Sequence, residues 1–147
     1  MKNLLVCIDF SDETKIILKH AKALAQSMSA KVWLLHVASP TPDFVSFEIG
    51  PQIVRDQQAH ILKSEHRELH EMQKKFAKSG LETTAIMVEG LTVDKILEQA
   101  KDIKADIILL GTHGSGQIHQ LLVGSVSQGV IKKTPCPVLL IPTKYID

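Results

Sequence analysis

Five short apolar runs constrain the fold of this chain more than any other feature of its sequence. They are NLLVCID (residues 3–9), KVWLLHV (31–37), LETTAIMV (81–88), ADIILLG (105–111) and CPVLLIP (136–142). An uninterrupted apolar run suits a strand that is buried on both faces, as in a parallel sheet. The segments between the runs read as helices, and this alternation predicts a parallel sheet with helices on both sides. We therefore expect an α/β fold, with one open five-stranded sheet in a single domain over residues 1–147.

Four helices are expected between these runs. The first, at 11–29, has Ser11 as its expected N-cap, acids in its first turn, and apolar residues spaced by three and four. A long polar helix over 52–80 ends at Gly80. A third helix covers 92–104 with Thr92 as its expected cap, and a fourth covers 125–133. Residues 38–51 form a proline-rich loop that is longer than most connections, so we expect a lid or a partner surface there.

Charge and composition exclude several classes of partner. The formal net charge is +1 and no long run of like charges occurs, which argues against a nucleic-acid groove or a membrane-binding face. The apolar start is too short for a signal peptide, and no segment reaches transmembrane length. Without an export signal, Cys7 and Cys136 are expected to be reduced, buried thiols. We therefore expect a soluble, cytoplasmic protein.

The predicted sheet gathers the ends of four strands at one edge. Asp9, Val37, Val88 and Gly111 end the first four apolar runs. Ligands of open parallel sheets bind beyond the carboxyl ends of the strands, where the strand order reverses. A charged residue such as Asp9 at that place is a candidate ligand contact, and it could equally serve as a turn or helix-cap residue.

The stretch GTHGSGQIHQLLVGSVSQG, residues 111–129, has five glycines in nineteen positions. Gly111 follows a strand, Gly114 comes three residues later, and Gly124 opens the last predicted helix. Amides at a helix start carry partial positive charge and attract anions, and the hydroxyls of Ser125 and Ser127 could donate to the same anion; Ser125 could equally be an N-cap. The lysine that phosphate-transferring loops place on the terminal phosphates is absent. The pattern therefore fits the binding of a nucleotide better than its rapid hydrolysis.

The residues Gly111, Gly114, Gly124 and Ser125 follow the spacing G-x2-G-x9-G-[ST]. Together with the opening LLVCIDFSDET, with VWLLHV and with CPVLLIP, this pattern resembles the universal stress proteins over essentially the whole chain. The resemblance implies a Rossmann-like five-stranded parallel sheet in the order 3-2-1-4-5, with its reversal between Asp9 and Gly111.

The ATP-binding branch of that family implies where a nucleotide would lie. The adenine would lie near the main chains of Cys7 and Val37, and Asp9 would lie near the base and ribose. The phosphates would rest on the loop and on the start of the last helix, at Gly111, Thr112, His113, Gly114, Ser115, Gly116 and Gln117, and at Gly124, Ser125, Val126 and Ser127. Ser115 and His119 stand where the family often has basic residues, so AMP or ADP could bind as well as ATP accompanied by Mg²⁺ or Mn²⁺.

Three classes of function remain open from the sequence. The resemblance favours a nucleotide-binding module for stress response or signalling, with an unknown protein partner. A slow ATPase or nucleotidyl transferase is the second, although no residue reads as a positioned base or nucleophile, so no catalytic residue is assigned. A protein-interaction dimer that needs no nucleotide is the third.

Two further predictions concern histidines and assembly. His66 and His70 have the i, i+4 spacing of zinc ligands, but polar residues surround them and favour a solvated helix face. His36, inside an apolar run, is expected to be a hydrogen-bonded core residue. A homodimer is expected through the last strand, because an apolar edge strand invites pairing with a second copy and the family resemblance points the same way. Its interface would comprise Pro137, Val138, Leu139, Leu140 and Ile141.

Overall fold

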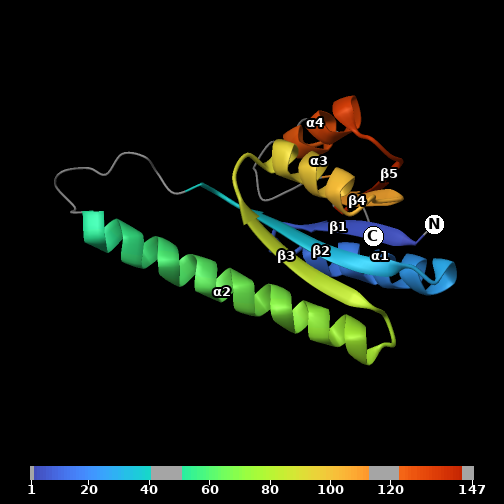
Figure 1. Ribbon diagram of the computed structural model, residues 1–147, viewed down its shortest axis with the longest axis horizontal. Coiled ribbons are helices and arrows are strands. Elements are labelled where there is room, and N and C mark those ends of the chain that lie inside the picture. Colours follow the sequence, from blue (N-terminus) through green and yellow to red (C-terminus); the bar gives the residue numbers. More distant parts are fainter. Residues whose placement is uncertain (1, 41–50, 113–122, 144–147) are drawn as a thin grey trace.

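The computed structural model, which describes residues 2–40, 51–112 and 123–143, contains a five-stranded sheet at its centre (Figure 1). Its strands are β1 (Asn3–Ile8), β2 (Lys31–Ala38), β3 (Thr83–Glu89), β4 (Ile107–Gly111) and β5 (Val138–Ile141). They are parallel throughout and lie in the order β3-β2-β1-β4-β5. The fold class and the strand order predicted from the sequence are both confirmed.

Helices cover the two faces of the sheet in pairs. Helices α1 (Thr14–Met28) and α2 (Pro51–Lys78) lie on one face, and α3 (Thr92–Asp102) and α4 (Ser125–Lys133) lie on the other (Figure 1). None of the described helices is long and apolar enough to span a membrane. Of the loop predicted at 38–51, residues 41–50 lie outside the described residues, so the lid or partner surface stays a prediction.

Two apolar cores result, one on each side of the sheet. Successive residues of a strand point to opposite faces, so the apolar runs serve both cores at once. In β1, Leu4 and Val6 pack toward α1 and α2, whereas Leu5 packs toward α3 and α4, and all three are fully buried. This double burial explains why these strands read as uninterrupted apolar runs.

The predicted caps of the first and third helices are wrong. Helix α1 begins at Thr14, three residues after Ser11, and no acid lies in its first turn. The Ser11 hydroxyl instead donates to the Asp9 carboxylate at 2.7 Å, because a charged oxygen is a stronger acceptor than a neutral one. Thr92 is the first residue of α3 rather than its cap, and the capping position, Leu91, has no side-chain hydrogen bond. The predicted end of the long helix is confirmed, since α2 stops at Lys78 and Gly80 follows with φ +80°.

Side chains close the amino edge of the sheet. The Asp106 carboxylate accepts hydrogen bonds from the backbone N–H of Lys2 at 2.7 Å and of Asn3 at 2.8 Å, and these bonds lower the pKa of that carboxyl. The Asn3 amide donates to the carbonyl of Ile103 and accepts from the Trp33 indole N–H at 3.1 Å. One network of side chains therefore joins β1 and β2 to the residues just before β4.

Candidate functional site

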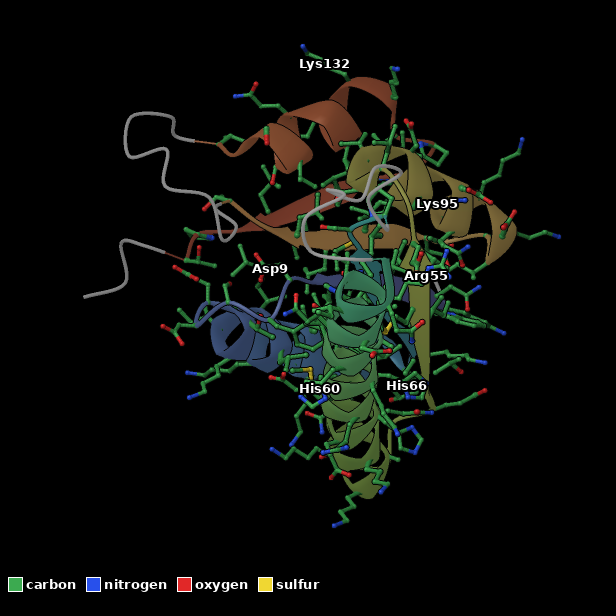
Figure 2. All side chains as sticks on the ribbon, turned by 90° about the vertical axis from the view of Figure 1, so that its left-hand side faces the viewer. Asp9, Arg55, His60, His66, Lys95 and Lys132 are labelled. Carbon is green, nitrogen blue, oxygen red and sulfur yellow. The ribbon has the colours of Figure 1, made fainter. Side chains whose placement is uncertain are left out.

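The candidate site lies at the carboxyl edge of the sheet, where β1 and β4 are neighbours. The chain leaves β1 toward α1 on one face, and it runs from the end of β4 to α4 on the other face. Such a divergence opens a crevice for a ligand in sheets of this kind. Figure 2 looks onto this edge and shows Asp9 on the connection between β1 and α1, with Arg55 and Lys95 on α2 and α3.

Asp9 organises the turn between β1 and α1. Its Oδ1 accepts hydrogen bonds from the backbone N–H of Ser11 at 3.0 Å, from the Ser11 hydroxyl, and from the Thr14 hydroxyl at 3.3 Å. Of the two roles that the sequence left open, the structure shows the turn role. The predicted contact with a base or ribose stays a prediction, and any ligand there would meet a carboxylate whose position is fixed.

The residue after Asp9 adopts an unusual backbone conformation. Phe10 has φ +58°, in the left-handed region that bulky side chains rarely adopt. Such a conformation costs on the order of 1–3 kcal/mol and persists where the surroundings impose it, often at functional sites. The Phe10 ring lies against the His36 ring, with 4.5 Å between their centroids.

The His36 side chain contacts the residues on either side of Asp9, Ile8 and Phe10. It is 7% exposed, and its Nδ1 lies 2.8 Å from the carbonyl oxygen of Ile8. Its Nε2 lies 3.2 Å from a carboxylate oxygen of Glu65 on α2. The predicted hydrogen-bonded core histidine is confirmed. Sequence reasoning missed the contacts with Phe10 and Glu65, because no pattern in one sequence pairs residues from separate elements in this way.

Two short hydrogen bonds join the end of β4 to the start of α4, and a third joins it to the end of β5. The backbone N–H of Gly124 donates to the carbonyl of Thr112 at 2.7 Å, and that of Thr112 donates to Ile141 at 2.9 Å. The Ser127 hydroxyl, buried in the first turn of α4, donates to the carbonyl of Gly111 at 2.8 Å. A hydroxyl has one proton to donate, so the predicted donation from Ser127 to an anion would compete with this bond.

Gly124 is the N-cap of α4, and its backbone does not need glycine. Its φ of −68° and ψ of 164° are open to any residue, and the described glycines with positive φ are Gly80 and Gly90. Ser, Thr, Asn or Asp would cap the helix with a side-chain oxygen, whereas Gly124 makes no such bond. Helix α4 therefore begins without a capping side chain at its N-cap position. Ser125 is the first helical residue and not the cap.

A different cause explains Gly129. A Cβ atom built there would lie 2.7 Å from a methyl group of Val93 on α3, closer than such atoms approach. This glycine of the stretch therefore serves helix packing.

Part of the predicted site lies outside the described residues. This part comprises His113, Gly114, Ser115, Gly116 and Gln117, and His119 lies outside as well. Cys7 and Val37 are described, and both pack toward α3 and α4. Burial raises the pKa of the Cys7 thiol far above its ordinary value, and both cysteines are free thiols. Their predicted adenine contacts through the main chain remain predictions.

Basic and metal-binding side chains contribute little to the described edge. Lys132 lies on the outer side of α4, away from the sheet (Figure 2), and the Lys95 ammonium lies 2.8 Å from Glu98. His66 and His70 are exposed on α2 as predicted, with parallel rings 6.4 Å apart. Within residues 2–40, 51–112 and 123–143, no three His, Cys, Asp or Glu side chains come together as a metal site would require.

Comparison with known proteins agrees with this architecture. The model of the universal stress protein family matches residues 1–142. A universal stress protein of Thermus aquaticus is 32% identical over 142 residues, which cover 95% of this chain and 98% of that protein. The solved structure of protein MJ0577 from Methanocaldococcus jannaschii has a TM-score of 0.82 at 30% identity, covering 99% of this chain and 98% of that one.

A more distant solved structure, that of a universal stress protein in complex with cAMP, is 24% identical with a TM-score of 0.70. The match covers 97% of this chain and 98% of that chain. The fold, the strand order and the family model agree, and the chain belongs to the universal stress protein family.

Proposed function

We propose that this protein is an adenine-nucleotide-binding module that binds ATP, ADP or AMP in stress response or signalling in the cytoplasm. The observation that carries the proposal is the bare N-terminus of α4. Gly124 caps it without a side chain and without a backbone need for glycine, and its N–H is tied to Thr112 at the end of β4. Helix amides presented in this way suit a phosphate. The cAMP complex of a family member supports the same ligand class.

Within this proposal, Asp9 lies on the base and ribose side and the start of α4 on the phosphate side. Asp9 directly follows β1 and Gly111 ends β4, and these two strands are neighbours in the sheet. Cys7 and Val37 would contact the adenine through their main chains. Residues 113–117 would complete the phosphate cradle.

Hydrolysis is expected to be weak or absent. Lys132 and Lys133 are in the last turn of α4, so they cannot act as the lysine of a phosphate-transferring loop. A Mg²⁺ or Mn²⁺ ion would accompany the phosphates, because phosphate oxygens are ligands that such ions prefer. A slow ATPase or nucleotidyl transferase is the alternative enzyme, and a nucleotide-independent interaction protein is the alternative without a ligand.

A thermal shift experiment tests nucleotide binding. A ligand at one hundred times its dissociation constant stabilises the folded state by about 2.7 kcal/mol. For a chain of this length we expect the melting temperature to rise by roughly 5–10 °C with ATP and Mg²⁺. Mass spectrometry of any co-purified small molecule provides an independent test. If no adenine nucleotide at millimolar concentration shifts the melting temperature, the binding proposal is wrong. A turnover assay with Mg²⁺ or Mn²⁺ separates binding from hydrolysis.

We also propose that two copies pair through β5. This strand lies at the edge of the sheet, and Leu139 is 40% exposed. Pro137 and Pro142 bracket it and leave Val138–Ile141 free to form a ladder. Leu140 packs toward α3 and α4, so a Leu140→Lys change would also disturb that core. Leu139→Lys is therefore the cleaner variant: light scattering at micromolar concentration should show a wild-type dimer and a weakened mutant dimer. A monomeric wild type would rule this proposal out.

A further inference from the structure

The contacts of His36 require more protons than a neutral imidazole has. The carbonyl of Ile8 can only accept, so the short contact at Nδ1 needs a hydrogen on that nitrogen. The Glu65 carboxylate also accepts when ionised, so the contact at Nε2 needs a second hydrogen. A neutral ring carries a hydrogen on only one of its two nitrogens. In that form one of the two contacts brings a nitrogen lone pair against an oxygen lone pair. Both contacts are complete when His36 is an imidazolium.

The partners of His36 join three parts of the fold. Ile8 is the last residue of β1 and directly precedes Asp9 in the sequence. Phe10 directly follows Asp9, and its ring packs against the ring of His36. Glu65 lies near the middle of α2. Asp9 is thus flanked on both sides in the chain by residues that contact His36. The unusual conformation of Phe10 is held in part by this ring contact.

Among the residues that the structure describes, the polar partners of the His36 ring are Ile8 and Glu65. In β3, Met87 pairs with His36 in the sheet register, and the neighbouring side chains of the same core are apolar. From α2, Leu69 and Met72 join this core, whereas the titratable or charged neighbours of Glu65 on that helix are exposed, namely His66, Arg67 and Glu68. The β1–α1 turn carries three carboxylates: the Oδ1 of Asp9 is engaged by Ser11 and Thr14, Asp12 is exposed, and Glu13 is half-buried.

We propose that His36 is a positioning residue whose protonated form, paired with Glu65 of α2, fixes the β1–α1 turn and thereby makes ligand binding at Asp9 depend on pH. The step from the turn to the ligand rests on the proposed nucleotide function. The direction follows from the hydrogen count: the pair is complete at the acid end of the histidine range, and it loses one bond as the pH rises.

A Glu65→Gln variant separates this role from simple packing. The glutamine side chain is nearly the same size, and its amide can donate to an unprotonated Nε2 while Nδ1–H still donates to Ile8. In this variant a neutral ring satisfies both contacts, so the turn should no longer respond to pH. Glu68→Gln removes an exposed carboxylate from the same helix and serves as the matched control.

The first measurement uses NMR of the full-length, ¹⁵N-labelled protein without ligand, over about pH 5 to about pH 8. In the wild type and in Glu68→Gln, the ring should carry hydrogens on both nitrogens at the acid end, and the amide signals of Phe10 and Ser11 should move together with the ring. In Glu65→Gln, the turn signals should stay constant, because the glutamine amide can donate to an unprotonated Nε2 or accept from a protonated one and so keeps both contacts in either form. If the wild-type turn signals do not follow the ring, or if the wild type and Glu65→Gln behave alike, the proposal is overturned. The wild-type comparison decides alone if Glu65→Gln does not fold.

The second measurement is AMP affinity over the same range. The phosphate of free AMP titrates in the same way whichever variant is present. The ratio of the wild-type dissociation constant to that of Glu65→Gln therefore reports only the pH dependence of the protein. Relative to Glu65→Gln, wild-type binding should weaken by about threefold to tenfold as the pH rises, the size of one neutral hydrogen bond. A constant ratio overturns the link from the turn to the ligand. Absence of AMP binding in every variant, with turn signals that still follow the ring, contradicts the proposed function and supports the positioning role.

Discussion

Side chains hold backbone groups at both the amino and the carboxyl edge of this sheet, and the carboxyl edge also contains a helix start without a side-chain cap. At the amino edge, Asp106 and Asn3 bind backbone N–H and carbonyl groups directly, and Trp33 completes the network. At the carboxyl edge, Gly124 leaves the start of α4 without a side-chain cap, and Phe10 is held in a left-handed conformation. Under the proposed function, the amino edge serves the stability of the fold and the carboxyl edge binds the ligand. Changes at the amino edge should alter the free energy of unfolding, and changes at the carboxyl edge should alter binding.

The largest effect is expected from Gly124→Val. The new side chain would stand where a phosphate approaches the amides of α4. Loss of two or more hydrogen bonds to a charged group, each about 1.5–3 kcal/mol, should weaken nucleotide binding by more than ~100-fold. The backbone angles of Gly124 accept valine, and an apolar N-cap costs only about 1 kcal/mol or less relative to glycine. Calorimetric titration with AMP and ATP measures the affinity, and a melting curve checks the fold.

A milder change at the same helix start should weaken nucleotide binding less than Gly124→Val does. Ser125→Ala removes one hydroxyl and keeps the backbone, so it should weaken binding by the equivalent of one hydrogen bond to a charged group, about 1.5–3 kcal/mol. If Gly124→Val binds nucleotide as the wild type does, the phosphates do not lie at α4, and the contrast between the edges fails.

At the opposite edge, Asn3→Ala should destabilise the fold and leave binding intact. The side chain of Asn3 donates to the carbonyl of Ile103 and accepts from Trp33. Loss of these bonds leaves partly buried groups without partners and should cost about 1–3 kcal/mol. Chemical denaturation measures the loss, and AMP titration serves as the control. A large loss of affinity with unchanged stability would reverse the roles of the two edges.

The smallest effect is expected from Asp106 at low pH. Its pKa is lowered in the folded state by the backbone N–H groups of Lys2 and Asn3, so the unfolded chain takes up the proton first. The stabilisation is present above the ordinary aspartate pKa of about 3.9 and is lost as the pH falls below it. Asp106→Asn should therefore be less stable near neutral pH, and the gap to the wild type should close in acid. Melting curves from neutral to acid pH measure this gap; a gap that stays constant would show that these hydrogen bonds do not depend on the charge.

The sequence alone was sufficient to predict those elements whose residues follow a regular pattern of apolar positions. Apolar runs predicted β1, β2 and β4, because burial on both faces leaves an apolar signature along the whole strand. Helix starts were less predictable, since Ser11 had a local acceptor in Asp9 that competes with capping. Family spacing pointed to Gly111 and Gly124, whereas the contact of His36 with Glu65 joins residues 29 positions apart and leaves no local pattern. The packing role of Gly129 against Val93 was hidden for the same reason.

Helix α2 is much longer than the strands that it covers. Its 28 residues span about 42 Å at 1.5 Å per residue, whereas a strand of seven residues such as β3 spans about 23 Å. Leu69 and Phe76 in its second half are buried, whereas Ile53 and Ile61 in its first half are about half exposed. Figure 1 shows these first turns extending past the carboxyl edge of the sheet. The second half of the helix therefore packs over the sheet, whereas its first turns extend beyond it. The exchange of its backbone amides with solvent should become progressively slower from the first turns to the second half.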